Sequence, residues 1–348
     1  MRAAILREPS PIESCPLVIQ QVAKPEPEPR HALLKVRACA VCRTDLHIVE
    51  ADLKPRCKSI IPGHQIVADV LKSSDPAFPP GTRVGVSWIG GVDGTCRFCQ
   101  RGRENLCDNA IYTGYTHNGG FAEYASARTD FLIRVPPELD DEAVAPLLCA
   151  GIIGFRSLRI ANVKHRQHIG LFGFGSSAQL MLQVLHAWDC KVYVSTRGSQ
   201  HRSLARKMGA KWVGDATELP PHRLDAAVTF APSGDVVLAA LQSLDKGGIV
   251  AINAIHLDRM PEFDYDSLLW GERQLRSVTN MTRRDAHDFL SLAAEIKLQP
   301  TMTTYPLEQV NEALLDLKRD RLHATAVIVP SSVASNRHEH SGATSEAT

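Results

Sequence analysis

The stretch HIGLFGFGSSAQLMLQVL, residues 168–185, decides how the second half of the chain folds. A short apolar run leads into GFGSSA, and apolar residues then recur at helical spacing, which predicts a buried strand, a tight turn and a helix. Gly173 permits the turn, Gly175 lets the backbone approach a pyrophosphate, and the small Ala178 allows close packing of helix on strand. We predict a dinucleotide-binding loop here; the alternative is a glycine-rich turn without a ligand.

Strand and helix patterns alternate from this loop onward. Such alternation predicts parallel strands joined by right-handed crossovers, hence an α/β, doubly wound (Rossmann) domain over residues 150–283. Ser176 and Ser177 begin its first helix and are predicted to bind the cofactor, because a helix N-terminus favours phosphate. The further expected strands are 191–196, 225–232, 247–255 and 275–280, and the further helices are 202–210 and 236–244.

The strand after the loop, KVYVST, leads into Ser195, Thr196 and Arg197 instead of an acidic residue. A carboxylate here would accept a hydrogen bond from the ribose 2′-hydroxyl of NAD, whereas hydroxyls and a guanidinium suit a 2′-phosphate. We therefore predict NADP(H), with NAD(H) less favoured. A solvated loop arginine is the alternative for Arg197.

Residues 1–149 have a different texture, with short β-type runs between turn residues. They predict a β-rich first domain. We expect the helix at 307–319 and the strand at 325–330 to rejoin it, so residues 284–330 are assigned to this domain as well. Its β-type runs are 31–38, 65–71, 82–88 and 121–126.

Length, charge and cysteine content limit the class of protein. The chain has 348 residues, enough for two domains, and a net charge of +1, which gives no field for binding nucleic acid or an anionic membrane. Nine cysteines, an odd count, do not suggest a disulfide framework. The N-terminus has no apolar leader and no apolar run is long enough to span a bilayer, so we expect a soluble cytoplasmic protein. The near-zero charge favours a small-molecule partner. Residues 331–348, with His338 and His340, lack apolar periodicity and are predicted to form a disordered, solvated tail.

Cys42, His64 and Cys149 form a candidate metal set. A Cys2His set leaves one tetrahedral position open, which a catalytic zinc needs. On residue types alone, a long chain offers a spare histidine and two spare cysteines, so an accidental set is the alternative.

Motif order favours the metal set. CRTDLH at 42–47, PGH at 62–64, GGFAEY at 119–124 and LCAG at 148–151, together with the glycine loop, resemble medium-chain, zinc-dependent alcohol dehydrogenases over residues 1 to about 330. The resemblance implies a GroES-like catalytic domain beside the Rossmann domain. It also implies that Cys42, His64 and Cys149 are the catalytic-zinc ligands.

The resemblance gives roles to the neighbours of Cys42. Thr44 would take the proton of the substrate alcohol, and the nicotinamide ribose and His47 would pass it to solvent, with a surface histidine as the alternative for His47. Asp45 would orient His64, and Arg43 would reach the cofactor pyrophosphate. One departure is Gln65, which stands where the family commonly has a glutamate behind the zinc.

The second departure lies in GVDGTCRFCQRGRENLC, residues 91–107. The family carries a structural zinc on four cysteines there, and alignment on the three cysteines of this chain puts an aspartate in the first place. Carboxylate oxygen is an accepted zinc ligand, so a Cys3Asp site is expected, and an empty or weakened site is the alternative. The four candidate ligands are Asp93, Cys96, Cys99 and Cys107.

Three further positions follow from the resemblance. Trp88 would face the substrate as an apolar wall, with a core tryptophan as the alternative. Residues 230–232 would border the adenosine, and residues 254–256, ending in His256, would border the nicotinamide carboxamide.

We therefore predict a zinc-dependent, NADP-preferring alcohol dehydrogenase that favours aldehyde reduction and forms a homo-oligomer, a dimer or a tetramer. An NAD-dependent polyol or sugar dehydrogenase is one alternative, which the absence of an acidic residue after KVYVST disfavours. A non-catalytic protein that binds NADPH or zinc is the other. The complete set of Cys42, Thr44, His47, His64 and Cys149 disfavours it, because a binding protein needs no proton relay.

Overall fold

The structure of the chain, a computed structural model, describes residues 1–216, 218–322 and 324–330. It divides into two compact units, Met1–Cys149 with the residues from Thr301 onward, and Ala150–Pro300. The predicted tail, residues 331–348, lies outside the described residues.

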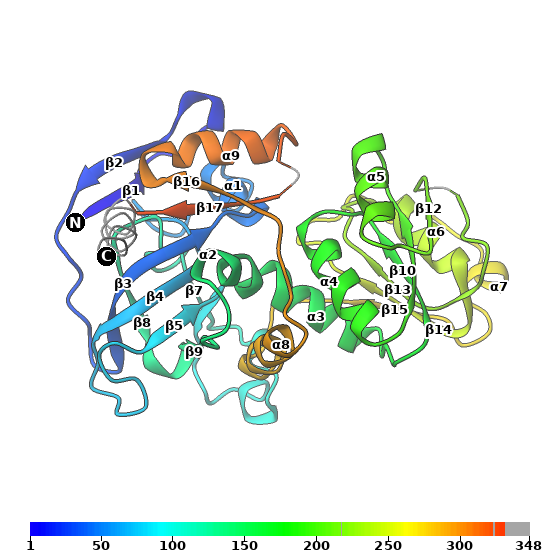
Figure 1. Ribbon diagram of the computed structural model, residues 1–348, viewed down its shortest axis with the longest axis horizontal. Helices are drawn as coiled ribbons and strands as arrows, with labels where there is room; N and C mark the ends of the chain where they lie inside the picture. Colours follow the sequence, from blue (N-terminus) through cyan, green and yellow to red (C-terminus); the bar gives the residue numbers. More distant parts are fainter. Residues whose placement is uncertain (217, 323, 331–348) are drawn as a thin grey trace, which may run out of the picture. The chain divides into compact units, whose positions relative to one another are not determined.

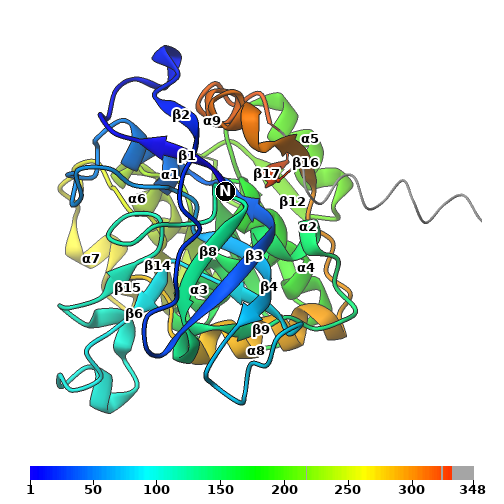
Figure 2. The same ribbon diagram turned by 90° about the vertical axis from the view of Figure 1, so that its left-hand side faces the viewer.

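A β-sheet forms the centre of the first unit. Its strands in pairing order are β16 (Met302–Pro306), β17 (Thr325–Val329), β3 (His31–Ala40), β4 (Gln65–Lys72), β5 (Arg83–Val86) and β9 (Ile133–Arg134), and β8 (Tyr124–Arg128) pairs with the first half of β3. Figure 2 shows β3 running between β4 and β8. Burial alternates along most of β3, because successive side chains of a strand point to opposite faces.

The C-terminal segment completes this sheet, as predicted for residues 307–330. Strand β17 pairs antiparallel with β3, through Val327 with Ala40 and Ile328 with Cys39. Helix α9 (Val310–Lys318) connects the parallel strands β16 and β17 and lies along both, as Figure 1 shows.

Shorter elements complete the first unit. Strand β1 (Arg2–Leu6) pairs with β2 (Leu17–Gln21), and β6 (Ile89–Gly91) pairs with β7 (Ile111–Tyr112). A loop of residues 92–110 connects β6 to β7. The helices are α1 (Arg43–Val49) and α2 (Asp141–Val144), and the 3-10 turns are η1 (Ile12–Ser14), η2 (Cys99–Arg101), η3 (Glu104–Leu106), η4 (Thr129–Phe131), η5 (Ala145–Leu148) and η6 (Leu307–Gln309).

The second unit is a parallel sheet with helical crossovers. Its strands in pairing order are β12 (Trp212–Gly214), β11 (Lys191–Ser195), β10 (His168–Phe172), β13 (Leu224–Thr229), β14 (Leu244–Ile252) and β15 (Gln274–Ser277). The strand order reverses at β10, so the carboxyl ends of β10 and β13 border the crevice in which such sheets bind ligands. The helices are α3 (Ala150–Ile160), α4 (Ser176–Ala187), α5 (Ser199–Lys207), α6 (Gly234–Ser243), α7 (Tyr265–Leu268) and α8 (Arg283–Glu295).

Helix α8 corrects the predicted domain assignment. We assigned residues 284–330 to the first domain, but the structure places residues 284–300 in the second unit. Helix α8 packs on α3, where the ring of Phe289 fills the space that a Cβ on Gly151 would occupy. Asp285 of α8 also pairs with Arg156 and Arg159 of α3, at 2.7 and 2.9 Å.

The two units confirm the predicted fold class, a β-rich domain followed by a doubly wound parallel domain. Within the described ranges, no single helix has the length and apolarity needed to cross a bilayer. The segments Asp141–Leu148 and Ala150–Ile160 reach that length and apolarity only when they are taken together. Most of their apolar side chains are buried.

Candidate functional site

Three separate segments bring Cys42, His64 and Cys149 together. Cys42 caps α1, His64 immediately precedes β4, and Cys149 follows η5. Their ligand atoms all lie within 4.8 Å of one another, and Sγ of Cys42 is 3.3 Å from Nε2 of His64. Two thiols and an imidazole are ligands that Zn²⁺ prefers, and three protein ligands leave one tetrahedral position open. These residues fit a catalytic zinc.

Asp45 orients this set from within the first turn of α1. The side chain is fully buried, and its Oδ1 accepts hydrogen bonds from Nδ1 of His64 at 3.0 Å and from the amide of Gly63 at 3.2 Å. Its Oδ2 accepts from the amide of Cys42 at 3.0 Å. Because Nδ1 is engaged by Asp45, Nε2 of His64 is the nitrogen available to a metal.

Burial and neighbouring charges shift the pKa values of Asp45 and of the candidate ligands. Burial raises the pKa of Asp45. Burial alone would lower the pKa of His64, but the neighbouring charges of Asp45 and Cys42 raise that pKa well above its usual value. A hydrogen bond with Cys149 lowers the pKa of Cys42 well below the usual thiol value, and the same bond raises the pKa of Cys149. Cys42 is therefore the first thiolate of the set, and a metal ion would displace the remaining protons.

The GGFAEY motif supports the loop that ends in His64. The amide of Gly119 donates to the carbonyl of Ile61 at 2.6 Å, and the amide of Gly120 donates to the carbonyl of Gly63 at 2.8 Å. A Cβ on Gly119 would lie 2.0 Å from the carbonyl oxygen of Gly63, so a side chain at residue 119 is incompatible with this contact. The two motifs are thus parts of one backbone clamp around a candidate zinc ligand.

Helix α1 presents the predicted proton-transfer residues. Thr44 and His47 are three positions apart, which places them on the same side of the helix. Thr44 is buried, and His47 is half-buried with its Nδ1 2.8 Å from Oδ2 of Asp52. Arg43, the first residue of α1, is exposed.

Gln65 is fully buried directly after His64. Neither its amide oxygen nor its amide nitrogen has a hydrogen-bond partner among the described residues. A buried amide without a partner costs about 1–3 kcal/mol, so a water molecule or another group that partners this amide would stabilise the region.

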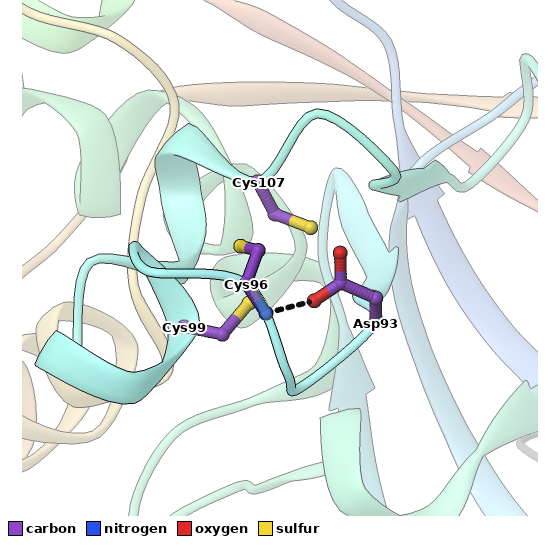
Figure 3. Close-up of side chains that lie close together, drawn as sticks. All are labelled: Asp93, Cys96, Cys99 and Cys107. Atoms are coloured by element: carbon purple, nitrogen blue, oxygen red, sulfur yellow. Dashed lines mark hydrogen bonds between the residues drawn. The ribbon is translucent and has the colours of Figure 1, made fainter.

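The loop of residues 92–110 holds a second candidate metal site, shown in Figure 3. One oxygen of Asp93 accepts from the amide of Cys96 at 3.0 Å, and the other accepts from Nδ2 of Asn109 at 3.0 Å. The bond from Cys96 contributes most to holding the pKa of Asp93 below its usual value, so this side chain is a carboxylate at neutral pH. Burial raises the pKa of Cys99 to about 12, so a metal would have to displace its proton. The ligand atoms within 4.8 Å of one another belong to Asp93, Cys96, Cys99 and Cys107.

The glycine loop lies between β10 and α4, as predicted. Gly173 has a φ of +94° and lies against the backbone of Phe230 and Ala231, which follow β13. Gly175 is the N-cap of α4 and has no side chain to cap it, and a Cβ at this residue would meet open space. The space in front of the N-terminus of α4 at Gly175 is therefore open.

The predicted cofactor-selecting residues differ in exposure. Ser195 and Thr196 are buried at the end of β11, and the hydroxyl of Thr196 donates to the carbonyl of Arg197 at 3.4 Å. Arg197 itself is exposed, as is His256 in the segment after β14. Among Ser195, Thr196 and Arg197, only Arg197 is exposed.

Trp88 lies beside the candidate catalytic set. Its ring is 5.2 Å from the His64 ring, at an interplanar angle of 75°. It also stacks on Tyr112 at 4.9 Å and on Tyr115 at 5.9 Å. Trp88 is thus packed among aromatic rings and also lies next to a candidate zinc ligand. The two interpretations of this residue, a core tryptophan and an apolar wall of the substrate site, are therefore compatible.

Comparisons with known proteins identify the family of the chain. Residues 28–137 match the family model described as alcohol dehydrogenase GroES-like domain. The chain is 43% identical to the probable alcohol dehydrogenase AdhA of Mycobacterium tuberculosis, over 94% of this chain and 97% of that protein. The chain belongs to the zinc-dependent medium-chain alcohol dehydrogenases.

Two solved structures share the fold of this alcohol dehydrogenase. One is CAD from Helicobacter pylori in complex with NADP(H), with a TM-score of 0.83, 20% identity and coverage of 95% of this chain and 99% of that one. The other is acetophenone reductase from Geotrichum candidum in complex with NAD, with a TM-score of 0.82, 23% identity and coverage of 95% and 97%. Because the two were solved with different cofactors, the likeness does not decide the cofactor of this alcohol dehydrogenase.

Sequence reasoning overlooked three parts of the site in this alcohol dehydrogenase. The stacking of Tyr112 and Tyr115 on Trp88 has no sequence signal, because the three rings come from a strand end and a loop. The contact of Asn109 with Asp93 is likewise made between loop residues. The clamp of Gly119 on Gly63 had a signal, since paired glycines mark close backbone approach.

Proposed function

We propose that this alcohol dehydrogenase depends on zinc at Cys42, His64 and Cys149, uses NADP(H) and favours the reduction of aldehydes. The observation that carries the proposal is the convergence of these three ligand atoms beside the polar first turn of α1. When bound, zinc supplies Lewis acidity toward the substrate oxygen and the nicotinamide supplies or accepts the hydride.

The polar residues of α1 handle the proton. In alcohol oxidation, the hydroxyl of Thr44 accepts the proton of the substrate hydroxyl while it releases its own proton toward His47, which passes a proton to solvent; in aldehyde reduction each transfer runs the opposite way. The half-buried position of His47 supports this role, because one end of a relay must reach water. Asp52 orients the imidazole of His47 through its bond to Nδ1.

The cofactor lies, in this proposal, across the carboxyl edge of the second unit. Its pyrophosphate binds the amides that begin α4, at Gly175, Ser176 and Ser177, and Gly173 allows the approach. The exposed guanidinium of Arg197 binds the 2′-phosphate, with Ser195 and Thr196 shaping the strand end behind it.

Two further parts of the cofactor site are proposed on the family resemblance. Arg43 binds the pyrophosphate and His256 borders the nicotinamide. Both side chains are exposed, as a ligand contact requires.

A second, structural zinc is proposed at Asp93, Cys96, Cys99 and Cys107. The donor set supports it, since three thiols and one ionised carboxylate are accepted zinc ligands. The loop that carries them contains two 3-10 turns and packs on a small apolar cluster, so a metal would stabilise it.

We also propose a cytoplasmic location and a homo-oligomer, a dimer or a tetramer. All nine cysteines are free thiols, which supports the first, because the cytosol keeps thiols reduced. Sedimentation of the zinc-loaded protein tests the second.

Initial rates of nicotinamide oxidation test the enzymatic proposal. The zinc-loaded protein is assayed with NADPH and with NADH over short aliphatic, long aliphatic and aromatic aldehydes. Faster turnover with NADPH that is lost when zinc is removed supports both the cofactor preference and the zinc chemistry. A preference for NADH would overturn the role of Arg197 and leave the zinc chemistry standing, and equal activity after zinc removal would overturn the zinc chemistry.

A further inference from the structure

Trp88 belongs to two parts of the first unit at once. It packs against the main core of that unit and against the small apolar cluster of Ile89, Val92, Cys107 and Phe131 under the second metal site. Its ring also lies edge-on to His64 at 5.2 Å. One side chain therefore contacts a catalytic-zinc ligand and the packing around the other ligand set.

The backbone strengthens this connection. Strand β6 begins directly after Trp88 and leads into Asp93, while Cys107 leads into β7 and Tyr112. The strands are paired through Ile89 with Tyr112, and the amide of Thr113 donates to the carbonyl of Trp88 at 2.9 Å. The metal-ligand loop is thus closed at its base by the residues that hold the indole.

Two tyrosines fix the plane of the indole. Tyr112 stacks on it at 4.9 Å with an interplanar angle of 27°, and Tyr115 stacks at 5.9 Å with an angle of 17°. The hydroxyl of Tyr115 donates to the carbonyl of Lys54 at 2.6 Å, which anchors this ring to a separate loop. Tyr112, at the end of β7, is the ring of the stack that belongs to the strand pair at the base of the metal-ligand loop.

We infer that metal bound by Asp93, Cys96, Cys99 and Cys107 positions Trp88 against His64 through Tyr112, so that the second metal site sets the shape of the substrate wall. The inference rests on the proposed second zinc. Metal binding closes the loop of residues 92–110 and thereby holds strands β6 and β7 together. This strand pair in turn holds the ring of Tyr112 against Trp88. Loss of that metal loosens Trp88 without removing any ligand of the catalytic set.

The test uses the full chain with Trp188, Trp212 and Trp270 replaced by Phe, so that only Trp88 emits. Zinc content, Trp88 emission, acrylamide quenching, and kcat and KM for one short and one aromatic aldehyde are measured together. The variant Cys99→Ser removes one ligand of the second site, and Cys15→Ser, at an exposed cysteine, is its matched control.

The background protein is expected to hold two zinc ions per chain, one for each ligand group. Cys99→Ser is expected to keep one, with Trp88 emission shifted to longer wavelength and stronger quenching. Its ratio of KM for the aromatic aldehyde to KM for the short aldehyde should rise about threefold, the scale of one lost aromatic pair, while kcat changes little. Cys15→Ser should match the background protein.

A second pair of variants keeps the inference testable if Cys99→Ser does not fold. Tyr112→Leu removes the ring between the loop and Trp88 and should reproduce the emission and KM changes with both zinc ions retained. Tyr112→Phe keeps the ring and should behave like the background protein.

If the background protein holds two zinc ions and Cys99→Ser holds one, but the Trp88 signal and the KM ratio respond to neither Cys99→Ser nor Tyr112→Leu, the inference is overturned and the structural zinc stands. A single zinc ion in the background protein would overturn both.

Discussion

Asp45 and His64 are joined by a hydrogen bond of 3.0 Å in which both side chains are fully buried. The same carboxylate also accepts from the amides of Gly63 and Cys42, so one side chain fixes the backbone on both sides of the candidate zinc. A buried carboxylate is costly unless its oxygens are satisfied, and here each oxygen has at least one donor. The pair therefore links the fold of α1 to the direction of a metal ligand.

Asp45→Asn should weaken the catalytic zinc site. The amide keeps the size of the carboxylate but turns an NH₂ group toward a donor, either the amide of Cys42 or Nδ1 of His64. Zinc affinity is expected to fall by about 10–100-fold, as for other groups that orient a metal-bound histidine. Competition with a chelator measures it. Asp52→Asn is the matched control, and an unchanged zinc affinity in Asp45→Asn would contradict the role of Asp45.

His47→Gln should lower kcat and leave zinc content unchanged. Glutamine cannot carry the proton, so kcat is expected to fall by roughly 10²-fold, and added imidazole should restore part of it. Steady-state rates with and without imidazole measure both effects. The proton path through His47 is excluded if kcat stays at the wild-type level in weak buffer.

Arg197→Ala should weaken the binding of NADPH and leave the binding of NADH nearly unchanged. Loss of a charge-assisted contact with the 2′-phosphate is expected to raise KM for NADPH by about tenfold or more, with KM for NADH nearly constant. Lys191→Ala, at the opposite end of β11, is the control. Parallel changes for both cofactors would show that Arg197 does not select the phosphate.

Asp285→Asn should destabilise the second unit at neutral pH. Burial opposes ionisation, but hydrogen bonds from Thr282 and the ion pair with Arg156 lower the pKa of Asp285 below its ordinary value of 3.8. Its contribution is therefore complete above the unfolded-state pKa and is lost as the pH falls through the folded-state pKa. Removal of this buried carboxylate, the partner of Arg156, is expected to lower the free energy of unfolding by about 3 kcal/mol.

Thermal unfolding of wild type and Asp285→Asn at pH 7 and near pH 3.5 measures that dependence. The difference in Tm should be large at pH 7 and smaller in acid. Asp288→Asn, which removes a more exposed carboxylate of the same helix, should cost less than about 1 kcal/mol. A Tm difference that grows on acidification would contradict the assigned sign.

The sequence was most informative where chemistry restricts residue types. The glycine loop was predictable because Gly173 adopts a positive φ, and the metal set because its motifs occur in a fixed order. Helix α8 was missed although Thr282 and Asp285 form a capping box at its start, because its many charged residues obscure the apolar stripe. The stack on Trp88 could not be predicted, since loop geometry decides which rings meet.

Zinc content and initial rate, measured on the same preparations of wild type and Cys42→Ser, test the central claim most directly. Serine still caps α1, so the fold should persist while a zinc ligand is lost. Cys190→Ser controls for loss of a cysteine elsewhere. We expect Cys42→Ser to hold one zinc ion fewer per chain and to lose aldehyde reduction, with circular dichroism unchanged. Wild-type rates in a Cys42→Ser protein that lacks this zinc ion would contradict a catalytic zinc at Cys42, His64 and Cys149.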